Sequence, residues 1–245
     1  MRPKTPQQIS AMRVAGQHLS AVFAAVEPLI QAGLTTEQLD DAIKREILRF
    51  GDRPAFLNYE GFPKSSCISV NEEVIHAIPG DRALQEGDIV TIDVGLWHDR
   101  VCVDAARTWA VGQVDAESQR LITVTAQALA AGVAAIRPGA RVGEISAAIQ
   151  AIADQAKLGI VRHYTGHGVG LALHEEPSIP NYGRTGDGPV LKEGLTICLE
   201  PMLTLGGDEV STLPDGWTVV TVDGSRAAQI EHTILITATG AEILV

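Results

Sequence analysis

The sequence contains little of several features that mark large classes of proteins. Aromatic residues make up 4% of its 245 residues, and its three cysteines, Cys67, Cys102 and Cys198, lie far apart with no C-x-x-C spacing. Disulfide frameworks and zinc-thiolate sites need paired or closely spaced cysteines, so neither is predicted. Three unpaired thiols fit a reducing compartment, and we expect a cytoplasmic protein.

Positive charge is scarce, and long apolar runs are missing. Nineteen Lys and Arg residues stand against 30 Asp and Glu residues, the net charge is -11, and no basic stripe occurs. Because phosphate backbones bind basic patches, a nucleic-acid substrate is excluded. No run approaches the roughly 18 apolar residues that cross a bilayer, and residues 1–13 lack a signal-peptide stretch. We therefore expect no membrane partner.

A repeated pattern of helices and strands runs through the chain. Two amphipathic helix pairs are predicted, and the glycines of their connecting loops, Gly33 and Gly139, are 106 residues apart. A Thr-x-x-Gln capping pattern at Thr35 begins the second helix. The predicted helices cover about residues 5–31, 35–50, 116–136 and 142–157, and the second loop is Arg137-Pro138-Gly139.

Each helix pair is followed by an alternating strand that begins with Glu-Gly. These segments are Glu86 to Asp93 and Glu193 to Glu200, and in both an acid stands seven residues after the first glutamate. We interpret the chain as one α+β domain, residues 1–245, with pseudo-repeat halves of about 1–112 and 113–245. Chance similarity between two helix pairs is the alternative explanation.

The acids of the first half lie on the polar faces of two neighbouring strands. Period two separates Asp93 from Val90, Ile92 and Val94, and it places Asp104 on the face of Cys102 in the next strand. A two-residue turn at residues 98–99 would put Asp93 directly opposite Asp104, with Cβ atoms roughly 5 Å apart. Two ionised carboxylates so placed require a cation or a shared proton.

The second half contributes two more acids, Glu200 and Glu231, each facing away from its apolar neighbours. Pseudo-symmetry would bring all four carboxylates to one centre. Hard oxygen ligands suit divalent cations, and four acids favour two bridged ions. Alternatively, each acid is a solvated residue at a strand end.

Histidines add a second set of candidate residues. His167 and His174 lie in the glycine-containing segment 164–177, where an imidazole could be a ligand, an acid or base, or a hydrogen-bond donor. His76, in segment 71–80, has the pattern of a turn histidine by itself. We expect His18 at the surface of the first helix and His98 in a turn.

Taken together, these segments resemble the signature of type I methionine aminopeptidases, in the short bacterial form, over nearly the whole chain. The matching segments are 69–80, 91–109, 164–177, 197–202 and 228–233. The resemblance implies the pseudo-two-fold pita-bread fold of the creatinase and aminopeptidase superfamily. It departs from the family pattern at Ala77, Leu173 and Phe62, which puts side-chain selectivity and rate in doubt.

The resemblance also implies a role for each matching residue. The implied cofactors are two divalent metal ions, of Co, Mn, Fe, Zn or Ni. One ion would be held by Asp104, His167, Glu200 and Glu231, and the other by Asp93 with Asp104 and Glu231 bridging. The implied catalytic residues are His76, His174 and Glu200, with Glu200 as proton shuttle. The implied substrate-binding residues are His76, His174, Tyr59, Phe62, Cys67, Leu173 and Trp217, with Phe56 less certain.

The implied activity is removal of the initiator methionine from nascent proteins whose second residue is small. The partners would be nascent N-termini and the exit region of the ribosome, and a monomer is expected. Two alternatives share the fold. One is a peptidase of the aminopeptidase P or prolidase type, and the other is a non-catalytic binding protein.

Overall fold

The computed structural model describes residues 1–137 and 139–245, so Pro138 of the predicted loop lies outside the described residues. Within that range four α-helices form as two pairs: α1 (Pro6–Val26), α2 (Thr36–Arg49), α3 (Ala116–Ala134) and α4 (Val142–Ala156). Thr35 and Gln38 form the predicted capping box at the start of α2. The predicted helix over residues 5–31 is too long, because α1 ends at Val26 and the 3-10 turn η1 (Glu27–Leu29) contains Pro28, which cannot continue an α-helix.

The first half contains a long antiparallel hairpin, β4 (Ile89–His98) and β5 (Val101–Ala110). β4 also pairs with β1 (Arg53–Pro54) and β2 (Cys67–Val70), which makes a four-stranded sheet. The 3-10 turn η2 (Tyr59–Gly61) lies in the segment between β1 and β2.

The predicted turn of this hairpin is wrong by one position. His98 pairs with Val101, so the turn residues are Asp99 and Arg100, whose φ angles are 41° and 67°. Without an Asn-Gly or Asp-Gly pair, the sequence does not fix which two residues adopt these left-handed angles. The register therefore moves by two residues, and Asp93 and Asp104 are diagonal neighbours instead of directly opposed. A two-residue shift preserves the faces, so both acids still share one side.

The second half contains a five-stranded sheet and contributes to two smaller sheets, one of which also includes a strand of the first half. The larger sheet has the order β15 (Ala241–Ile243), β14 (His232–Ile236), β9 (Thr196–Leu199), β7 (Gly166–Gly168) and β8 (Glu175–Ile179). One three-stranded sheet has the order β13 (Ala227–Gln229), β10 (Met202–Thr204) and β6 (Gly159–Ile160). The other has the order β11 (Val210–Thr212), β12 (Val219–Thr221) and β3 (Glu73–Ile75).

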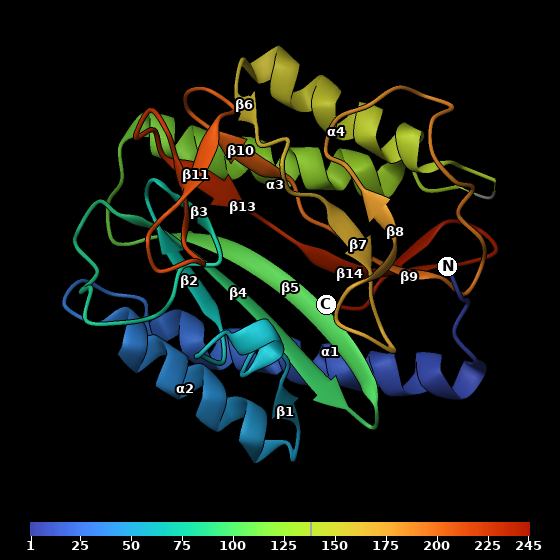
Figure 1. Ribbon diagram of the computed structural model, residues 1–245, viewed down its shortest axis with the longest axis horizontal. Coiled ribbons are helices and arrows are strands. Elements are labelled where there is room, and N and C mark those ends of the chain that lie inside the picture. Colours follow the sequence, from blue (N-terminus) through green and yellow to red (C-terminus); the bar gives the residue numbers. More distant parts are fainter. Residues whose placement is uncertain (138) are drawn as a thin grey trace.

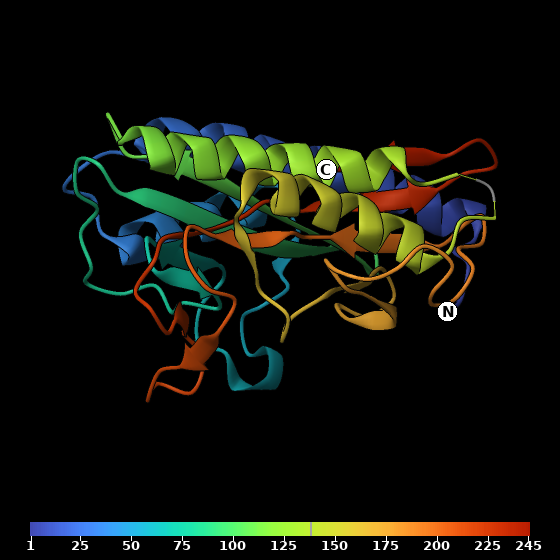
Figure 2. The same cartoon turned by 90° about the horizontal axis from the view of Figure 1, so that it is seen from above.

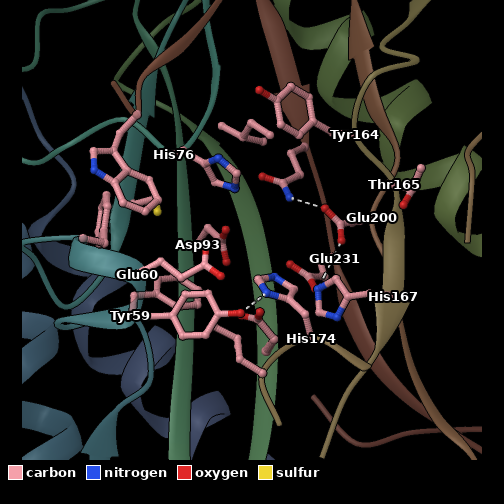
Figure 3. Close-up of a pocket in the computed structure, with 18 residues that line it drawn as sticks. Tyr59, Glu60, His76, Asp93, Tyr164, Thr165, His167, His174, Glu200 and Glu231 are labelled. Carbon is pink, nitrogen blue, oxygen red and sulfur yellow. Dashed lines mark hydrogen bonds and ion pairs between the residues drawn. The ribbon is translucent and has the colours of Figure 1, made fainter. Parts of the chain in front are cut away.

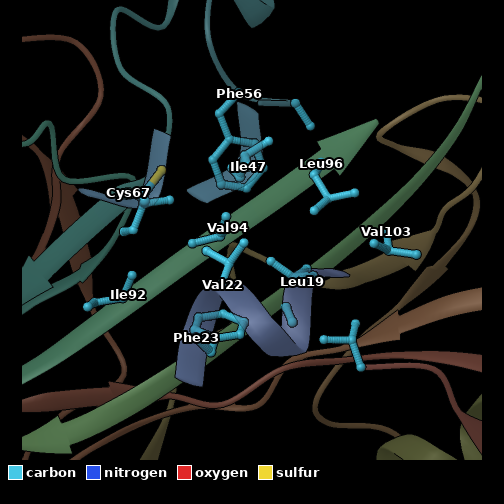
Figure 4. Close-up of a cluster of buried hydrophobic side chains, with 14 of the residues drawn as sticks. Leu19, Val22, Phe23, Ile47, Phe56, Cys67, Ile92, Val94, Leu96 and Val103 are labelled. Carbon is cyan, nitrogen blue, oxygen red and sulfur yellow. The ribbon is translucent and has the colours of Figure 1, made fainter. Parts of the chain in front are cut away.

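Helices α1 and α3 lie on one side of the strand layer, and loops extend from the other side (Figure 1, Figure 2). α1 packs on β4 and β5, where Leu19 and Phe23 meet Ile92 and Val94 in the core (Figure 4). Burying each such side chain contributes about 1.5–3 kcal/mol. The helices thus cover one face of the central strands, and the opposite face is left for other contacts.

The two halves meet along β5. The Glu231 N–H donates to the Ala106 carbonyl at 2.8 Å, and the Asp104 N–H donates to the Thr233 hydroxyl at 2.9 Å. That hydroxyl in turn donates to the Asp104 carbonyl at 2.7 Å. These bonds hold an acid of each half beside the other. Among the described residues, no helix combines the length and apolar character needed to cross a membrane.

Candidate active site

A cavity of about 300 Å³ opens between the two halves (Figure 3). All the residues predicted for the site line it, although they come from both halves and from many separate elements. They are Asp93, Asp104, His167, Glu200, Glu231, His76, His174, Tyr59, Phe62, Cys67, Leu173, Trp217 and Phe56. The convergence of the four acids is therefore a property of the fold.

Strand registers place the four carboxylates. Asp93 and Asp104 point from β4 and β5, whereas Glu200 and Glu231 lie at breaks between strands. Leu199 pairs with His232 on one side of the breaks, and Met202 pairs with Gln229 on the other. The same register extended across the gap puts Glu200 opposite Glu231. Pro201 follows Glu200 and lacks the N–H that a continuous ladder would need.

Burial gives these acids unusual proton affinities. Asp93 is 8% exposed, Asp104 3%, Glu200 8% and Glu231 2%. Loss of solvent raises the pKa of Asp104 to about 7. Burial, followed by repulsion from neighbouring carboxylates, raises the pKa values of the other three well above their ordinary range. Without a cation, the cluster must hold protons near neutral pH.

The donor atoms fit a cation. Among the described residues, Asp93 Oδ1, Asp104 Oδ1 and Glu231 Oε1 are buried without a hydrogen-bond partner. Such orphaned acceptors are costly unless something neutralises them. Donor atoms of Asp104, His167 and Glu231 lie within 4.8 Å of one another, together with the Cys198 thiol. Burial raises the pKa of Cys198 well above its ordinary value, so it stays protonated and leaves oxygen and nitrogen donors.

His167 presents its free ring nitrogen to the acids. The Gly168 carbonyl accepts from Nδ1 at 2.9 Å, and Nε2 lies 3.5 Å from Glu200 Oε1. This is the arrangement by which a backbone carbonyl fixes the tautomer of a ligating histidine. Burial, with a smaller contribution from His174, lowers the pKa of His167 to about 4, so its lone pair is available at neutral pH.

Two further histidines flank the cluster. Burial and then the nearby His174 lower the pKa of His76 to about 4, and its backbone φ of 58° is left-handed. Burial also lowers the pKa of His174. The Tyr59 hydroxyl lies 2.8 Å from His174 Nδ1, and the His174 ring meets that of His167 edge-on with centroids 4.3 Å apart. Both flanking rings are neutral at physiological pH.

The remaining wall of the cavity is apolar. Phe62 and Trp217 pack edge-on with centroids 5.1 Å apart, and Leu173 is 2% exposed. Cys67 pairs with Asp93 across β2 and β4 and is 5% exposed. Burial raises the pKa of the Cys67 thiol well above its ordinary value, so the thiol stays protonated where it lines the cavity. This wall offers a slot for an apolar side chain.

Sequence reasoning missed several residues of the site. Gln229 donates to Glu200 Oε2 at 3.1 Å, and Asn181 donates to the Glu200 carbonyl at 3.0 Å. Tyr164 and Glu60 also line the cavity. A lone Gln or Asn in a strand or loop has no spacing signal, so only the fold reveals these contacts.

Comparison with known proteins gives one consistent result. The sequence profile of Metallopeptidase family M24 matches residues 10–238. The methionine aminopeptidase of Treponema pallidum (strain Nichols) is 47% identical over 245 residues, which cover 100% of this chain and 96% of that protein. Methionine aminopeptidase 1 of Bacillus subtilis (strain 168) is 44% identical over 241 residues, 98% of this chain and 97% of that protein. A crystal structure of methionine aminopeptidase from Rickettsia prowazekii has a TM-score of 0.98 at 42% identity, covering 100% of this chain and 99% of that one.

Fold and site define a metal-dependent peptidase with the pita-bread fold. The chain belongs to metallopeptidase family M24. The predicted α+β fold, the resemblance, the divalent-metal cofactors and the hydrolase activity are thereby confirmed.

Proposed function

We propose that this protein is an aminopeptidase that removes N-terminal methionine from polypeptides with a small second residue. The observation that carries the proposal is a single cavity in which four buried acids and His167 adjoin an apolar slot. Relatives that are 40–47% identical bear the name methionine aminopeptidase, which disfavours the prolidase-type and non-catalytic alternatives. We further propose that residues 1–112 and 113–245 are pseudo-repeat halves of one domain.

The metal-binding residues follow from the donor set. Asp104, His167, Glu200 and Glu231 would hold one divalent ion, and Asp93 with bridging Asp104 and Glu231 would hold the other. When bound, such ions polarise a carbonyl oxygen and lower the pKa of water toward neutrality. Carboxylate oxygens and one imidazole nitrogen are suitable ligands for divalent Co, Mn, Fe, Zn or Ni.

The Glu200 carboxylate is the proton carrier. Gln229 and Asn181 fix its side chain and backbone, so its oxygens can accept a proton at the reacting centre and return it to the leaving amine. A hydrogen bond donated by the Tyr59 hydroxyl to His174 Nδ1, 2.8 Å away, would leave an Nε2–H to donate to the oxygen of the scissile carbonyl. Neutral His76 faces the same cavity and would contact the scissile amide.

The apolar slot selects the first side chain. Methionine is unbranched and polarisable, and its sulfur packs favourably against aromatic rings such as Phe62 and Trp217. The free amine would lie near Asp93, beside the slot, which accounts for cleavage only at the N-terminus. Nascent polypeptides in the cytoplasm, near the ribosome exit, are the substrates we propose for a monomeric enzyme.

Peptide hydrolysis tests this function. Met-Ala-Ser, Leu-Ala-Ser and Ala-Pro-Ala are incubated with the protein in the presence of a chelator, and then after addition of Mn or Co. We expect cleavage of Met-Ala-Ser alone, abolished by the chelator and restored by the metal. Cleavage of only the proline peptide would instead identify the prolidase-type activity, and no cleavage with metal bound would support the binding protein.

A further inference from the structure

A second group of metal-ligating side chains lies outside the cavity. His18 of α1 and His98 at the end of β4 both contact Asp52, which lies between α2 and β1. His18 Nδ1 is 2.8 Å from Asp52 Oδ2, and His98 Nδ1 is 2.7 Å from Asp52 Oδ1. Each carboxylate oxygen thus faces a different imidazole.

Packing of three elements brings these residues together. Arg53 pairs with Trp97 in the ladder between β1 and β4, so the next position along that ladder sets Asp52 beside His98. The His18 ring stacks on Phe50 with centroids 4.3 Å apart and meets the His98 ring edge-on at 5.1 Å. His18, expected at the surface of the first helix, is partly buried in this cluster, with its side chain 22% exposed. Figure 1 shows the end of α2 and β1 next to this end of the hairpin.

The charge of Asp52 needs a partner. The Asp52 side chain is 2% exposed, and within residues 1–137 and 139–245 its ion-pair partners are these two histidines, with no lysine or arginine. A buried carboxylate is costly unless a cation compensates it. An imidazole nitrogen that carries a free lone pair is a good ligand for a transition metal.

We propose that His18, Asp52 and His98 form a second metal site, which takes a divalent transition ion of the zinc class. Their ligand atoms lie within 4.8 Å of one another. Zinc bonds to nitrogen and oxygen at about 2.0–2.2 Å, so two ligands of one tetrahedral ion are about 3.4 Å apart, and small side-chain movements close the difference. The two imidazole side chains are 22% and 20% exposed, which gives the ion a path and leaves coordination positions for water.

A bound ion would connect α1, the end of α2 and the β4–β5 hairpin. Two imidazoles and one carboxylate suit Zn, Ni or Cu better than Mg or Ca. Because the ion binds the folded chain through residues distant in sequence, it raises stability as its concentration exceeds its Kd. This site shares no residue with the peptidase centre, and its metal would affect stability instead of catalysis.

The number of zinc ions bound per chain tests the proposal. The unaltered chain, His98→Gln, His18→Gln and the control His163→Gln are equilibrated with zinc, and bound zinc is measured by elemental analysis after circular dichroism has established folding. His163 is exposed and outside both sites, so its variant should bind as much zinc as the unaltered chain. We expect each of the other two variants to bind one equivalent less. Equal binding in all four proteins would overturn the site and leave a hydrogen-bonded cluster.

Diffraction on the unaltered chain makes the test independent of how the variants fold. Crystals soaked in zinc should show an anomalous peak between His18, Asp52 and His98. The absence of this peak in crystals whose peptidase cavity is fully occupied by zinc would overturn the proposal. Zinc should also raise the Tm of the unaltered chain more than that of His98→Gln. Peptide cleavage should be the same in both, so loss of peptidase activity would bear on the proposed function alone.

Discussion

The two walls of the cavity differ in how the chain builds them. The acidic wall comes from β4, β5 and the breaks beside β9 and β14, where antiparallel registers fix every position. The apolar wall comes mainly from loops, including η2 with Tyr59 and the segments that carry Leu173 and Trp217. Strand positions tolerate little movement, whereas loop positions vary in sequence and conformation.

Because of that difference, we expect the acidic wall to determine the reaction and the apolar wall to determine substrate selectivity. A carboxylate displaced by one strand position would face the helices, so the metal-binding wall permits almost no change. The apolar wall carries two of the departures from the family pattern, Leu173 and Phe62, and still encloses a slot. We expect substitutions in the first wall to abolish activity and those in the second to redirect it.

The largest effect is expected from Asp104→Asn. This substitution removes a carboxylate that both proposed ions would share. Loss of a residue that only hydrogen-bonds to a ligand costs up to about 100-fold, so kcat/KM for Met-Ala-Ser should fall by more than about 100-fold. Bound metal should fall in parallel, as elemental analysis would show. The control is Glu117→Gln, which makes the same kind of change at an exposed position of α3 and should alter neither quantity.

Substitution of His174 should impair turnover without loss of metal. His174→Ala removes the donor to the scissile carbonyl, and kcat should fall by about 100-fold to 1,000-fold. Tyr59→Phe keeps the imidazole but removes its hydroxyl partner, so a loss of about 10-fold is expected, equivalent to one hydrogen bond. Steady-state kinetics with metal content measured alongside distinguishes these results. Loss of metal from His174→Ala would assign this histidine to the ligand set instead.

Changes to the apolar wall should alter selectivity. Trp217→Ala enlarges the slot, and we expect kcat/KM for Met-Ala-Ser to fall by about 10-fold to 100-fold, mainly through KM, since pocket contacts contribute about 1–3 kcal/mol. Trp217→Phe should retain most activity. Competition between Met-Ala-Ser and Leu-Ala-Ser measures the change in preference. An unchanged preference in Trp217→Ala would place the methionine side chain elsewhere.

The smallest effect is a gradual dependence of metal affinity on pH. Burial raises the pKa of Asp104 to about 7, so below that pH the ion must displace its proton, and metal affinity should rise as pH increases from about 5 to 7. The lowered pKa of His167, about 4, means that this ligand releases no proton near neutrality. Each displaced proton makes the metal affinity rise about tenfold per pH unit, and calorimetric titration can measure this rise. Constant affinity from about pH 5 to pH 7 would contradict the protonated cluster.

Much of this molecule could be predicted from local patterns. The capping box at Thr35, the paired helices and the strands that carry Asp93 and Asp104 follow from propensity and periodicity, which act over a few residues. The predicted positions of helix ends and turns were less accurate, as at Pro28 and at Asp99–Arg100. Several near-equal local geometries exist at such positions, and packing selects among them.

The sequence by itself determined which faces of the strands carry acids, because side chains alternate with period two, and the resemblance of its segments to a known family indicated that family. Only the tertiary structure decided the distances between those acids, the contacts of Gln229 and Asn181 with Glu200, and the meeting of His18 with Asp52 and His98. These pairs are far apart along the chain. Their approach depends on the packing of whole helices and sheets, which no short stretch of residues specifies.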